Sequence, residues 1–297
     1  MSMKEKVCIL MWDEVSIQPK LTYDRRKNII CGFEDWGNNR TQKFADHALV
    51  FMLRGLYSGW KMPISFSFCN KQTNTAQLIR CIKEHVLKLK QVGFHIVAGV
   101  CDQGSSNVAA IKELILFSNK KRKSENRPER KTFEIAGNEI IPLYDPPHLI
   151  KGIRNNFLTK DLAMKVRNNN VEKIASWNII KTAWIMDKTL HVTRPHLRKI
   201  TPEHIIESKI KKMRVKHAVQ VLSGTMASVI ETFTRSKLTV RVDNEDIYIK
   251  DEEGLATLEA VDFFNNLFDS VNGDNKNNNN ELRCSVTKNS KHHAFWI

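Results

Sequence analysis

The sequence predicts an α/β chain, in which a mixed β-sheet with flanking helices is followed by a mainly α-helical second half. Two apolar stretches of strand length, residues 7–12 and 95–101, each end on an acid, Asp13 and Asp102. After His148 strand-like patterns become rare and helical spacing dominates. Acids at the carboxyl ends of buried strands stand where ligand and metal sites form in α/β folds.

The elements before Asp102 follow from apolar spacing and turn residues. We expect a strand at 5–17, a hairpin at 21–33, strands at 48–56 and 62–68, a helix at 75–91 and a strand at 95–101. The helix shows an apolar face at helical spacing, and Asn74 or Thr75 is suited to cap it. Gly93 should end it. Antiparallel-looking strands followed by helix, strand and helix are the order of an RNase H-like domain, and differ from the strict alternation of a Rossmann fold.

Residues 119–131 (NKKRKSENRPERK) form a charged segment without apolar residues, which we interpret as a loop. As a basic cluster it could be a nuclear localisation signal or a loop that contacts phosphates, and a merely solvated loop is the alternative. A short hairpin at 134–145 follows. Its second strand again ends in an acid, Asp145.

The second half should be mainly helical, which places a domain boundary after residue 147 and gives domains 1–147 and 148–297. Helical patterns cover 149–158, 171–187, 202–231 and 256–271, while 238–250 is either a strand pair or an extended loop. The asparagine-rich tract 272–281 is of low complexity and is expected to be mobile.

The composition favours a polyanionic partner. The 297 residues carry a formal charge of +15, which is typical of nucleic-acid binding, with an anionic membrane surface as the rival. No apolar run approaches the roughly 20 residues of a membrane span, and the start lacks a signal peptide. The six cysteines form no C-x-x-C pair, which favours a reducing, intracellular setting.

Asp13 and Asp102 end strands that should be neighbours in one sheet. Paired carboxylates there could hold one or two Mg²⁺ ions for phosphodiester chemistry. The alternative makes Asp102 a helix N-cap and Asp13 a surface acid. Four competing acids are expected to face solvent: Glu14, Glu34, Asp35 and Asp46.

Other enzyme and metal motifs are absent or weak. The sequence has no phosphate-binding G-x-x-x-x-G-K-[ST] loop, no G-x-S-x-G and no H-E-x-x-H. His191 and His196 show no acid or cysteine at ligand spacing in our reading, and we interpret them as structural or surface residues.

Four blocks in the first half resemble the P element transposase family, which includes the THAP-domain transposases. They are WDEVSI at 12–17, LVFMLRG with SGWKMP at 49–63, CDQGSSN at 101–107 and DPPHLIKGIRN at 145–155. The resemblance implies an RNase H-like catalytic domain interrupted by a helical GTP-binding insertion domain. It implies that Asp13 and Asp102 are the first two members of a metal-binding catalytic triad. Asp145 and His148 would form the family's D-x-x-H signature.

The second half resembles the insertion domain at residues 210–223 and 263–272. Carried over residue by residue, the nucleotide contacts of the family fall on Lys199, Arg214, Val215, Ser223, Phe268, Asp269 and Asn272. Arg214 stands where the family has Lys, which keeps the charge but changes the geometry of phosphate contact. Phe268 could instead be a core position on an amphipathic helix.

The resemblance implies DNA cleavage and strand transfer with Mg²⁺ or Mn²⁺, and GTP as an assembly cofactor that need not be hydrolysed. It implies transposon ends and target DNA as partners, a homo-oligomer in full-length members, and the nucleus as location. The third catalytic acid, the zinc DNA-binding domain and the coiled coil are missing, so we expect a fragment, truncated at both ends, that is inactive alone. A non-catalytic DNA- or partner-binding derivative and a guanine-nucleotide-binding module are the alternatives.

Overall fold

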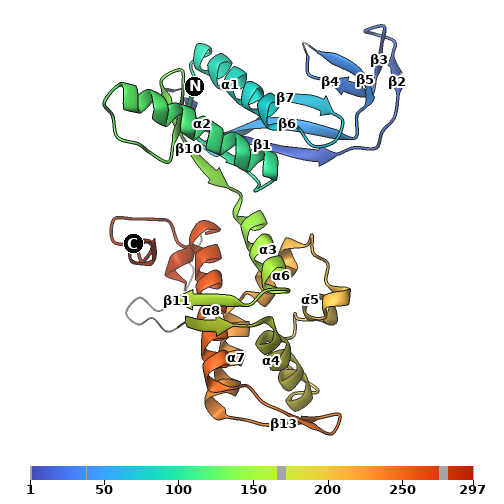
Figure 1. Cartoon of the computed structure of the whole chain (residues 1–297), viewed down its shortest axis with the longest axis vertical. Helices are drawn as coiled ribbons and strands as arrows, with labels where there is room; N and C mark the ends of the chain where they lie inside the picture. Colours follow the sequence, from blue (N-terminus) through green and yellow to red (C-terminus); the bar gives the residue numbers. More distant parts are fainter. Residues whose placement is uncertain (1, 38, 166–171, 274–279, 297) are drawn as a thin grey trace. The chain divides into compact units, whose positions relative to one another are not determined.

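The computed structural model describes residues 2–37, 39–165, 172–273 and 280–296, and the chain divides into two compact units (Figure 1). Unit 1 is Met1–Asp145 and unit 2 is Pro146–Ile297, so the division lies two residues before the predicted boundary. Residues 274–279 of the tract that was predicted to be mobile lie outside the described residues.

Unit 1 is a mixed sheet with two long helices. Its elements are η1 (Lys4–Lys6), β1 (Val7–Ser16), β2 (Thr22–Asp24), β3 (Ile29–Cys31), β4 (Phe33–Asp35), β5 (Arg40–Phe44), β6 (His47–Gly55), β7 (Lys61–Cys69), α1 (Thr75–Gln91), β8 (His95–Cys101), α2 (Ser105–Ser124), β9 (Phe133–Ile135) and β10 (Asn138–Tyr144). The hairpin β2–β3 stands apart from the main sheet.

The main sheet has eight strands in the order β5-β4-β7-β6-β1-β8-β10-β9. The strand β1 pairs antiparallel with β6 and parallel with β8, which in turn pairs parallel with β10. Three adjacent strands in the middle of the sheet therefore run in one direction. Their carboxyl ends meet at a single edge.

The core of unit 1 lies between one face of this sheet and the helices α1 and α2, which lie side by side over it (Figure 1). Alternate residues of β1, Cys8, Leu10 and Trp12, are buried in that core, as the period of two in a strand requires. The predicted cap of α1 is confirmed, since the Asn74 side chain accepts the N–H of Gln77.

The prediction that residues 119–131 form a loop is wrong for residues 119–124, which continue α2, and right for residues 125–131, which are exposed and lie outside helices and strands. Arg122 in the helical part is fully buried. Its guanidinium lies 3.1 Å from the carboxylate of Glu134 on β9 and also bonds Thr132. Arg127 pairs with Glu134 as well. The basic segment is thus fastened to the hairpin β9–β10 by charge-assisted hydrogen bonds.

Unit 2 is mainly helical. Its elements are α3 (Pro146–Phe157), β11 (Leu162–Lys165), β12 (Glu172–Ala175), α4 (Trp177–Leu190), α5 (Pro202–Ile205), η2 (Glu207–Lys209), α6 (Val215–Val221), α7 (Gly224–Ser236), β13 (Val240–Val242), β14 (Glu245–Ile247), α8 (Asp251–Val271), η3 (Glu281–Arg283) and α9 (His292–Trp296). The strand pair β13–β14 is one of the two predicted alternatives for 238–250.

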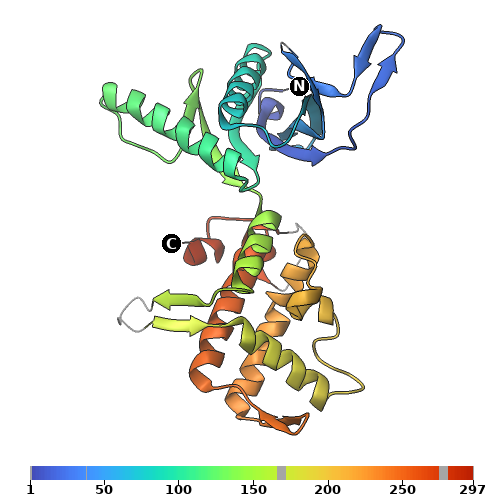
Figure 2. The ribbon, with the colours of Figure 1, turned by 45° about the vertical axis from the view of Figure 1, so that its right-hand side comes forward.

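The core of unit 2 is built by α3, α4, α6, α7 and α8, with the hairpin β11–β12 packed on α8 (Figure 2). Two tryptophans of α4 fasten the following connection to it. The indole N–H of Trp177 donates to the carbonyl of Ile205, and that of Trp184 to the carbonyl of Ile200. The hairpin was not predicted, and the helix predicted over 171–187 is wrong at Glu172–Ala175, which form β12, since α4 begins only at Trp177. The strands of the hairpin are short and carry few apolar residues.

The longest helices are α2 and α8, with 20 and 21 residues. Both carry charged residues along their length, and within the described residues no helix is both long and apolar enough to cross a membrane.

Substituting alanine for two helical glycines of unit 2 should change its stability in opposite directions. In a helix interior alanine is more favourable than glycine by about 1 kcal/mol. A Cβ at Gly152 in α3 would meet no atom within 4 Å, whereas a Cβ at Gly254 in α8 would lie 2.3 Å from Oγ1 of the buried Thr234. Gly152→Ala should therefore stabilise unit 2. Gly254→Ala should destabilise it by about 1 to 2 kcal/mol, since overpacking costs about 1 to 3 kcal/mol.

The measurement is hydrogen exchange of the α7 and α8 amides in both variants and the wild type. Equal stabilisation by the two substitutions would contradict the close α7–α8 packing at Gly254.

Candidate metal and nucleotide sites

Strand register brings three acids to one edge of the sheet in unit 1. In the parallel pairs, Met11 of β1 lies opposite Val100 of β8, and Val100 lies opposite Leu143 of β10. Asp13, Asp102 and Asp145 each follow two residues after these paired positions. The three acids are therefore level with one another on adjacent strands, at the edge where ligands bind in α/β sheets.

The carboxylate of Asp102 is held in place from two sides. Its Oδ1 accepts the N–H of Gly104 at 2.9 Å and the side-chain amide of Asn107 at 2.6 Å. The amide oxygen of Asn107 accepts the indole N–H of Trp12 at 2.8 Å. A chain of hydrogen bonds thus runs from the core to Asp102. Both of these bonds to Asp102 use Oδ1.

Asp13 and Asp102 line the same cavity of about 190 Å³ at this edge. Polar side chains complete its lining, namely Glu14, Ser16, His47, Gln72, Ser106 and Asn107. The expectation that Glu14 faces solvent is wrong, because its carboxylate is half-buried and accepts the N–H of Thr73 at 2.8 Å. The structure therefore brings the two predicted metal-binding acids together, and Glu14 becomes a neighbour of the site.

The pKa of the Cys101 thiol is affected by the acids at this edge. Burial is the main cause that raises its pKa to about 12, and the negative charges of Asp102 and Asp13 raise it further. Both carboxylates therefore act on one neighbouring group. At neutral pH Cys101 stays a neutral thiol, which makes it a packing residue rather than a nucleophile.

The donors at this edge fit a hard divalent cation. Mg²⁺ takes oxygen ligands, keeps several waters and usually needs only one or two carboxylates from the protein. Two carboxylates in a small cavity with serine and amide oxygens meet that requirement. The alternative role of Asp102 as a helix cap is not what the structure shows at α2, where Gly104 occupies the N-cap position and no side chain caps the helix.

The D-x-x-H residues stand where β10 gives way to α3. Asp145 follows β10, and its N–H donates to the carbonyl of Cys101 at 2.8 Å. His148 is the third residue of α3. Pro146 and Pro147 begin that helix because proline lacks the N–H that a first helical turn leaves unpaired.

Among the predicted nucleotide residues, Ser223 and Asp269 are linked through Asn265 of α8. Ser223 caps α7, where its hydroxyl accepts the N–H of Met226. The next N–H, that of Gly224, donates to the Asn265 amide oxygen at 3.0 Å, and the Asn265 amide nitrogen lies 3.4 Å from Asp269. The N-terminus of α7 and the C-terminal part of α8 therefore form one polar site. Asn265 was missed, although its i, i+4 spacing from Asp269 could have revealed it.

Asp269 has a partly buried carboxylate, with 18% of its side chain exposed. It accepts a hydrogen bond from Asn280 at 2.8 Å, and its carboxylate lies 3.7 Å from Arg283. Burial raises the pKa of Asp269, while Arg283, Asn265 and Asn280 act in the opposite direction. Three side chains of unit 2 thus hold this carboxylate in place.

The remaining predicted residues are spread along unit 2. Phe268 packs against the core, in agreement with its alternative interpretation, and Asn272 is the exposed C-cap of α8. Val215 begins α6 and packs on the same core, and Arg214 is its exposed N-cap. Lys199 is exposed in the connection after α4.

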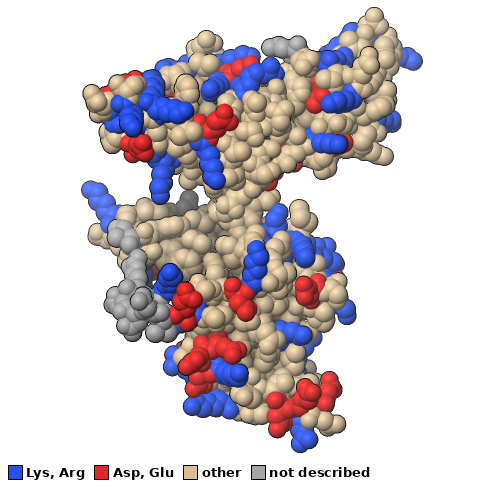
Figure 3. All heavy atoms as spheres, viewed as in Figure 1, with Lys and Arg blue, Asp and Glu red and all other residues tan. Residues whose placement is uncertain are grey.

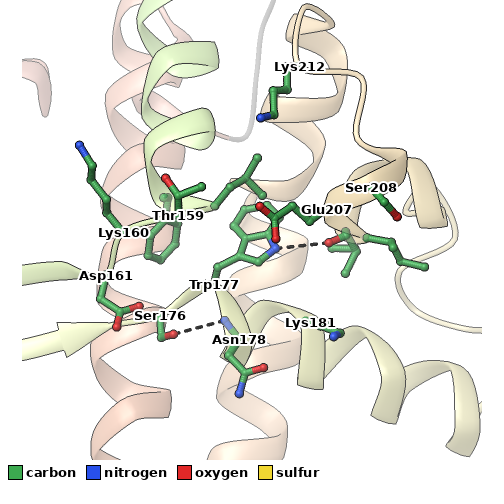
Figure 4. A pocket seen from close by; sticks show the side chains of 14 residues that line it. Thr159, Lys160, Asp161, Ser176, Trp177, Asn178, Lys181, Glu207, Ser208 and Lys212 are labelled. Atoms are coloured by element: carbon green, nitrogen blue, oxygen red, sulfur yellow. Dashed lines mark hydrogen bonds between the residues drawn. The ribbon is translucent and has the colours of Figure 1, made fainter.

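A separate cavity of about 890 Å³ opens in unit 2 between the ends of α3 and α4 and the segment around η2 (Figure 4). The indole of Trp177 forms part of its wall, and Lys181 and Lys212 lie on opposite sides of it. Glu207 also lines it. None of the seven predicted nucleotide residues does. The cavity is thus a second place in this unit where a polar ligand has room.

The interpretation that His191 and His196 have no acid at ligand spacing is wrong. Asp187 precedes His191 by one helical turn and was overlooked, although i, i+4 is the spacing that places two residues on one helix face. Its buried carboxylate accepts both imidazole Nδ1 groups, at 3.2 Å from His191 and 2.9 Å from His196. Burial acts to raise the pKa of Asp187, but the N–H of Leu197 and the bonds from His196 together lower it.

Basic side chains gather over the C-terminal end of α2 (Figure 3). Part of this charge is neutralised, since Arg122, Arg127 and Arg130 pair with Glu134 and Glu139. The lysines there extend into solvent and form a positive surface of unit 1.

Two family models match most of the chain. The TNP-like, RNase H N-terminal domain matches residues 1–115, and the TNP-like, GTP-binding insertion domain matches residues 147–284. The predicted fold class, an RNase H-like mixed sheet followed by a mainly helical insertion domain, is confirmed.

Relatives of known identity agree with these matches. The "Transposable element P transposase" of Drosophila melanogaster is 28% identical over 227 residues, which are 76% of this chain and 26% of that protein. The solved "Drosophila P element transposase strand transfer complex" superposes with a TM-score of 0.67 at 25% identity, covering 92% of this chain and 52% of that chain. The chain thus spans about a quarter of the first relative and about half of the second.

We expect the chain to bind a divalent metal ion through the carboxylates of both Asp13 and Asp102. Wild-type chain should bind Mn²⁺ or Mg²⁺ in calorimetry, and the double variant Asp13→Asn/Asp102→Asn should lose that binding, because it removes both anionic ligands while keeping the side-chain shapes. Asp35→Asn in β4, which replaces a half-buried acid that does not line this cavity, is the matched control. Identical binding by the double variant and the wild type would remove the metal assignment.

Proposed function

Because the chain belongs to the P element transposase-like family, we propose that unit 1 carries the acidic site of a metal-dependent DNA cleavage and strand-transfer reaction. The observation that carries this proposal is the level placement of Asp13, Asp102 and Asp145 on three adjacent parallel strands, with the first two lining one cavity. The chemistry of the full-length relatives, with transposon ends and target DNA as substrates, is part of the proposal.

The residues of this chain would hold and orient the metal. Asp13 and Asp102 would supply carboxylate oxygens, and the hydrogen bonds from Asn107 and Gly104 would fix the Asp102 carboxylate before any ligand arrives. A bound Mg²⁺ lowers the pKa of water and stabilises a leaving oxygen. We propose Asp145 as a further acid at this edge, which adds negative charge for the cation.

The positive charge of the chain supports the DNA part of the proposal. Lysines over the end of α2 and the +15 total charge would contact phosphates and make binding strongly dependent on salt. Because its substrate would be DNA, we propose that the protein is located in the nucleus. We also propose that the full-length proteins act as homo-oligomers.

Unit 2 is proposed to bind GTP as an assembly cofactor, in accordance with the GTP-binding domain family that it matches. The site formed by Ser223, Asn265 and Asp269 supports this location. The Asp269 carboxylate would accept the two N–H groups on the guanine edge, and adenine lacks that pair of adjacent donors. Arg214 would contribute positive charge toward phosphates.

A second candidate function is non-catalytic DNA binding. The basic surface of unit 1 favours it, since electrostatic contact with phosphates needs no acidic site.

The two functions differ in their dependence on Asp102. Under the first, any Mg²⁺- or Mn²⁺-dependent nicking of supercoiled DNA should fall at least about a thousandfold in Asp102→Asn, because the variant loses a metal-binding carboxylate, while DNA binding measured by anisotropy stays unchanged. Asp35→Asn should nick like the wild type. We expect the fragment alone to be inactive, so a wild type that binds DNA but no Mn²⁺, or nicking that is unchanged in Asp102→Asn, would favour the second function.

GTP binding by two variants distinguishes the two possible nucleotide sites, the one at Asp269 and the 890 Å³ cavity. Asp269→Ala should weaken binding of a fluorescent GTP analogue at least about tenfold, since it removes charged hydrogen-bond acceptors worth about 1.5 to 3 kcal/mol each. Lys212→Ala, in the 890 Å³ cavity, should bind as the wild type does. The reverse result would move the nucleotide to that cavity, and a folded wild type that binds no GTP would end the proposal.

A further inference from the structure

The residues Asp187, His191 and His196 of unit 2 form a cluster that the transposase chemistry does not use. One ligand atom from each of them lies within 4.8 Å of the others. Asp187 lies on α4 and is fully buried, His191 is the C-cap of that helix, and His196 follows in the next turn. We propose that these three side chains form a binding site for a transition-metal cation of the zinc class.

The distances between the donor atoms fit such an ion. Zinc takes imidazole nitrogen and carboxylate oxygen at about 2.0 to 2.2 Å, which in tetrahedral geometry separates neighbouring ligand atoms by about 3.3 Å. In the structure Oδ1 of Asp187 lies 3.2 Å from Nδ1 of His191 and 2.9 Å from Nδ1 of His196. Each imidazole nitrogen thus lies within about 0.4 Å of the separation from Oδ1 that such an ion requires.

The carboxylate is already oriented by the backbone. Oδ2 of Asp187 accepts the N–H of Leu197 at 2.9 Å, and Oδ1 accepts the N–H of His196 at 3.1 Å. Such outer bonds fix the direction of a metal ligand. The two imidazole rings stand at 89° to each other with centroids 4.4 Å apart, so they approach the carboxylate from different directions.

The cluster also has an entry path. The His196 side chain is 61% exposed and that of His191 is 38% exposed. An ion can therefore reach the donors from solvent, and a water can fill the fourth position. On binding, each Nδ1 would give up its hydrogen bond to Asp187, with the ring proton on Nε2 or released to solvent.

The donor set selects the kind of cation. Two imidazole nitrogens and one carboxylate suit Zn²⁺ and its neighbours in the first transition series, whereas Mg²⁺ prefers oxygen ligands alone. The site would therefore be distinct in chemistry from the acidic edge of unit 1. A bound ion would fasten the connection between α4 and α5, which includes Lys199.

Calorimetry with ZnCl₂ on the whole chain, after treatment with a chelator, tests the site. Wild type should bind one Zn²⁺ here, and His191→Ala and His196→Ala should each weaken that binding at least about tenfold. These side chains are partly exposed, so the variants should fold, which circular dichroism checks. Asp187→Asn is the riskier variant, because the carboxylate accepts several structural bonds.

Two controls separate this site from other metal binding. His293→Ala removes an exposed histidine of the same unit that bonds the carbonyl of Thr287, and it should bind Zn²⁺ as the wild type does. Asp13→Asn/Asp102→Asn should also keep the Zn²⁺ site. Co²⁺ should give visible absorption typical of tetrahedral nitrogen and oxygen ligands in the wild type and in both control variants, and this absorption should be weakened in His191→Ala and His196→Ala. Unchanged Zn²⁺ binding in both His191→Ala and His196→Ala, or no binding by the wild type, would overturn the proposal.

Discussion

The parallel pairing of β1, β8 and β10 is the constraint on which the acidic site depends. Side chains alternate along a strand, so a shift of one residue in either pairing would send an acid to the other face of the sheet. The buried residues of β1 prevent such a shift, since Leu10 and Trp12 must point into the core beneath α1 and α2. The same packing that stabilises the sheet therefore sets the level of Asp13 beside Asp102. Position of the acids is a by-product of core burial.

Trp12 connects that core to the chemistry. Its ring is buried against Phe51, yet its indole N–H must find an acceptor inside the protein, because an unpaired buried donor costs about 1 to 3 kcal/mol. The amide oxygen of Asn107 is the acceptor, and its amide N–H donates a hydrogen bond to Asp102. The buried indole N–H of Trp12 needs an acceptor, and the Asn107 side chain that provides it also orients the Asp102 carboxylate. The Asp102 carboxylate is therefore oriented by the core although it follows the end of a strand.

The sequence predicted what local patterns determine and missed what distant partners determine. The bounds of α1 and the strands ending in Asp102 and Asp145 follow from apolar spacing and capping residues nearby in the chain. By contrast, the sequence suggests that Arg122 is a surface cation, whereas in the structure it is paired with Glu134 of β9 and bonded to Thr132. Glu14 was misjudged for the same reason, since its partner Thr73 is 59 residues away. The bringing together of Asp13 and Asp102 could be inferred from strand order, but the cavity and the role of Asn107 needed coordinates.

The basic charge of the chain is a poorer guide to a contact surface than its sum suggests. The guanidinium groups around the end of α2 are committed to Glu134 and Glu139, where they fasten a helix to a hairpin. An arginine held in a bidentate or buried pair has few donors left for a phosphate. Lysines beside them carry no such structural bonds to these glutamates and keep mobile, hydrated charges that suit phosphate contact. Within one basic segment, then, arginine builds the fold and lysine provides the electrostatic surface, so a lysine-to-arginine exchange there would not be conservative.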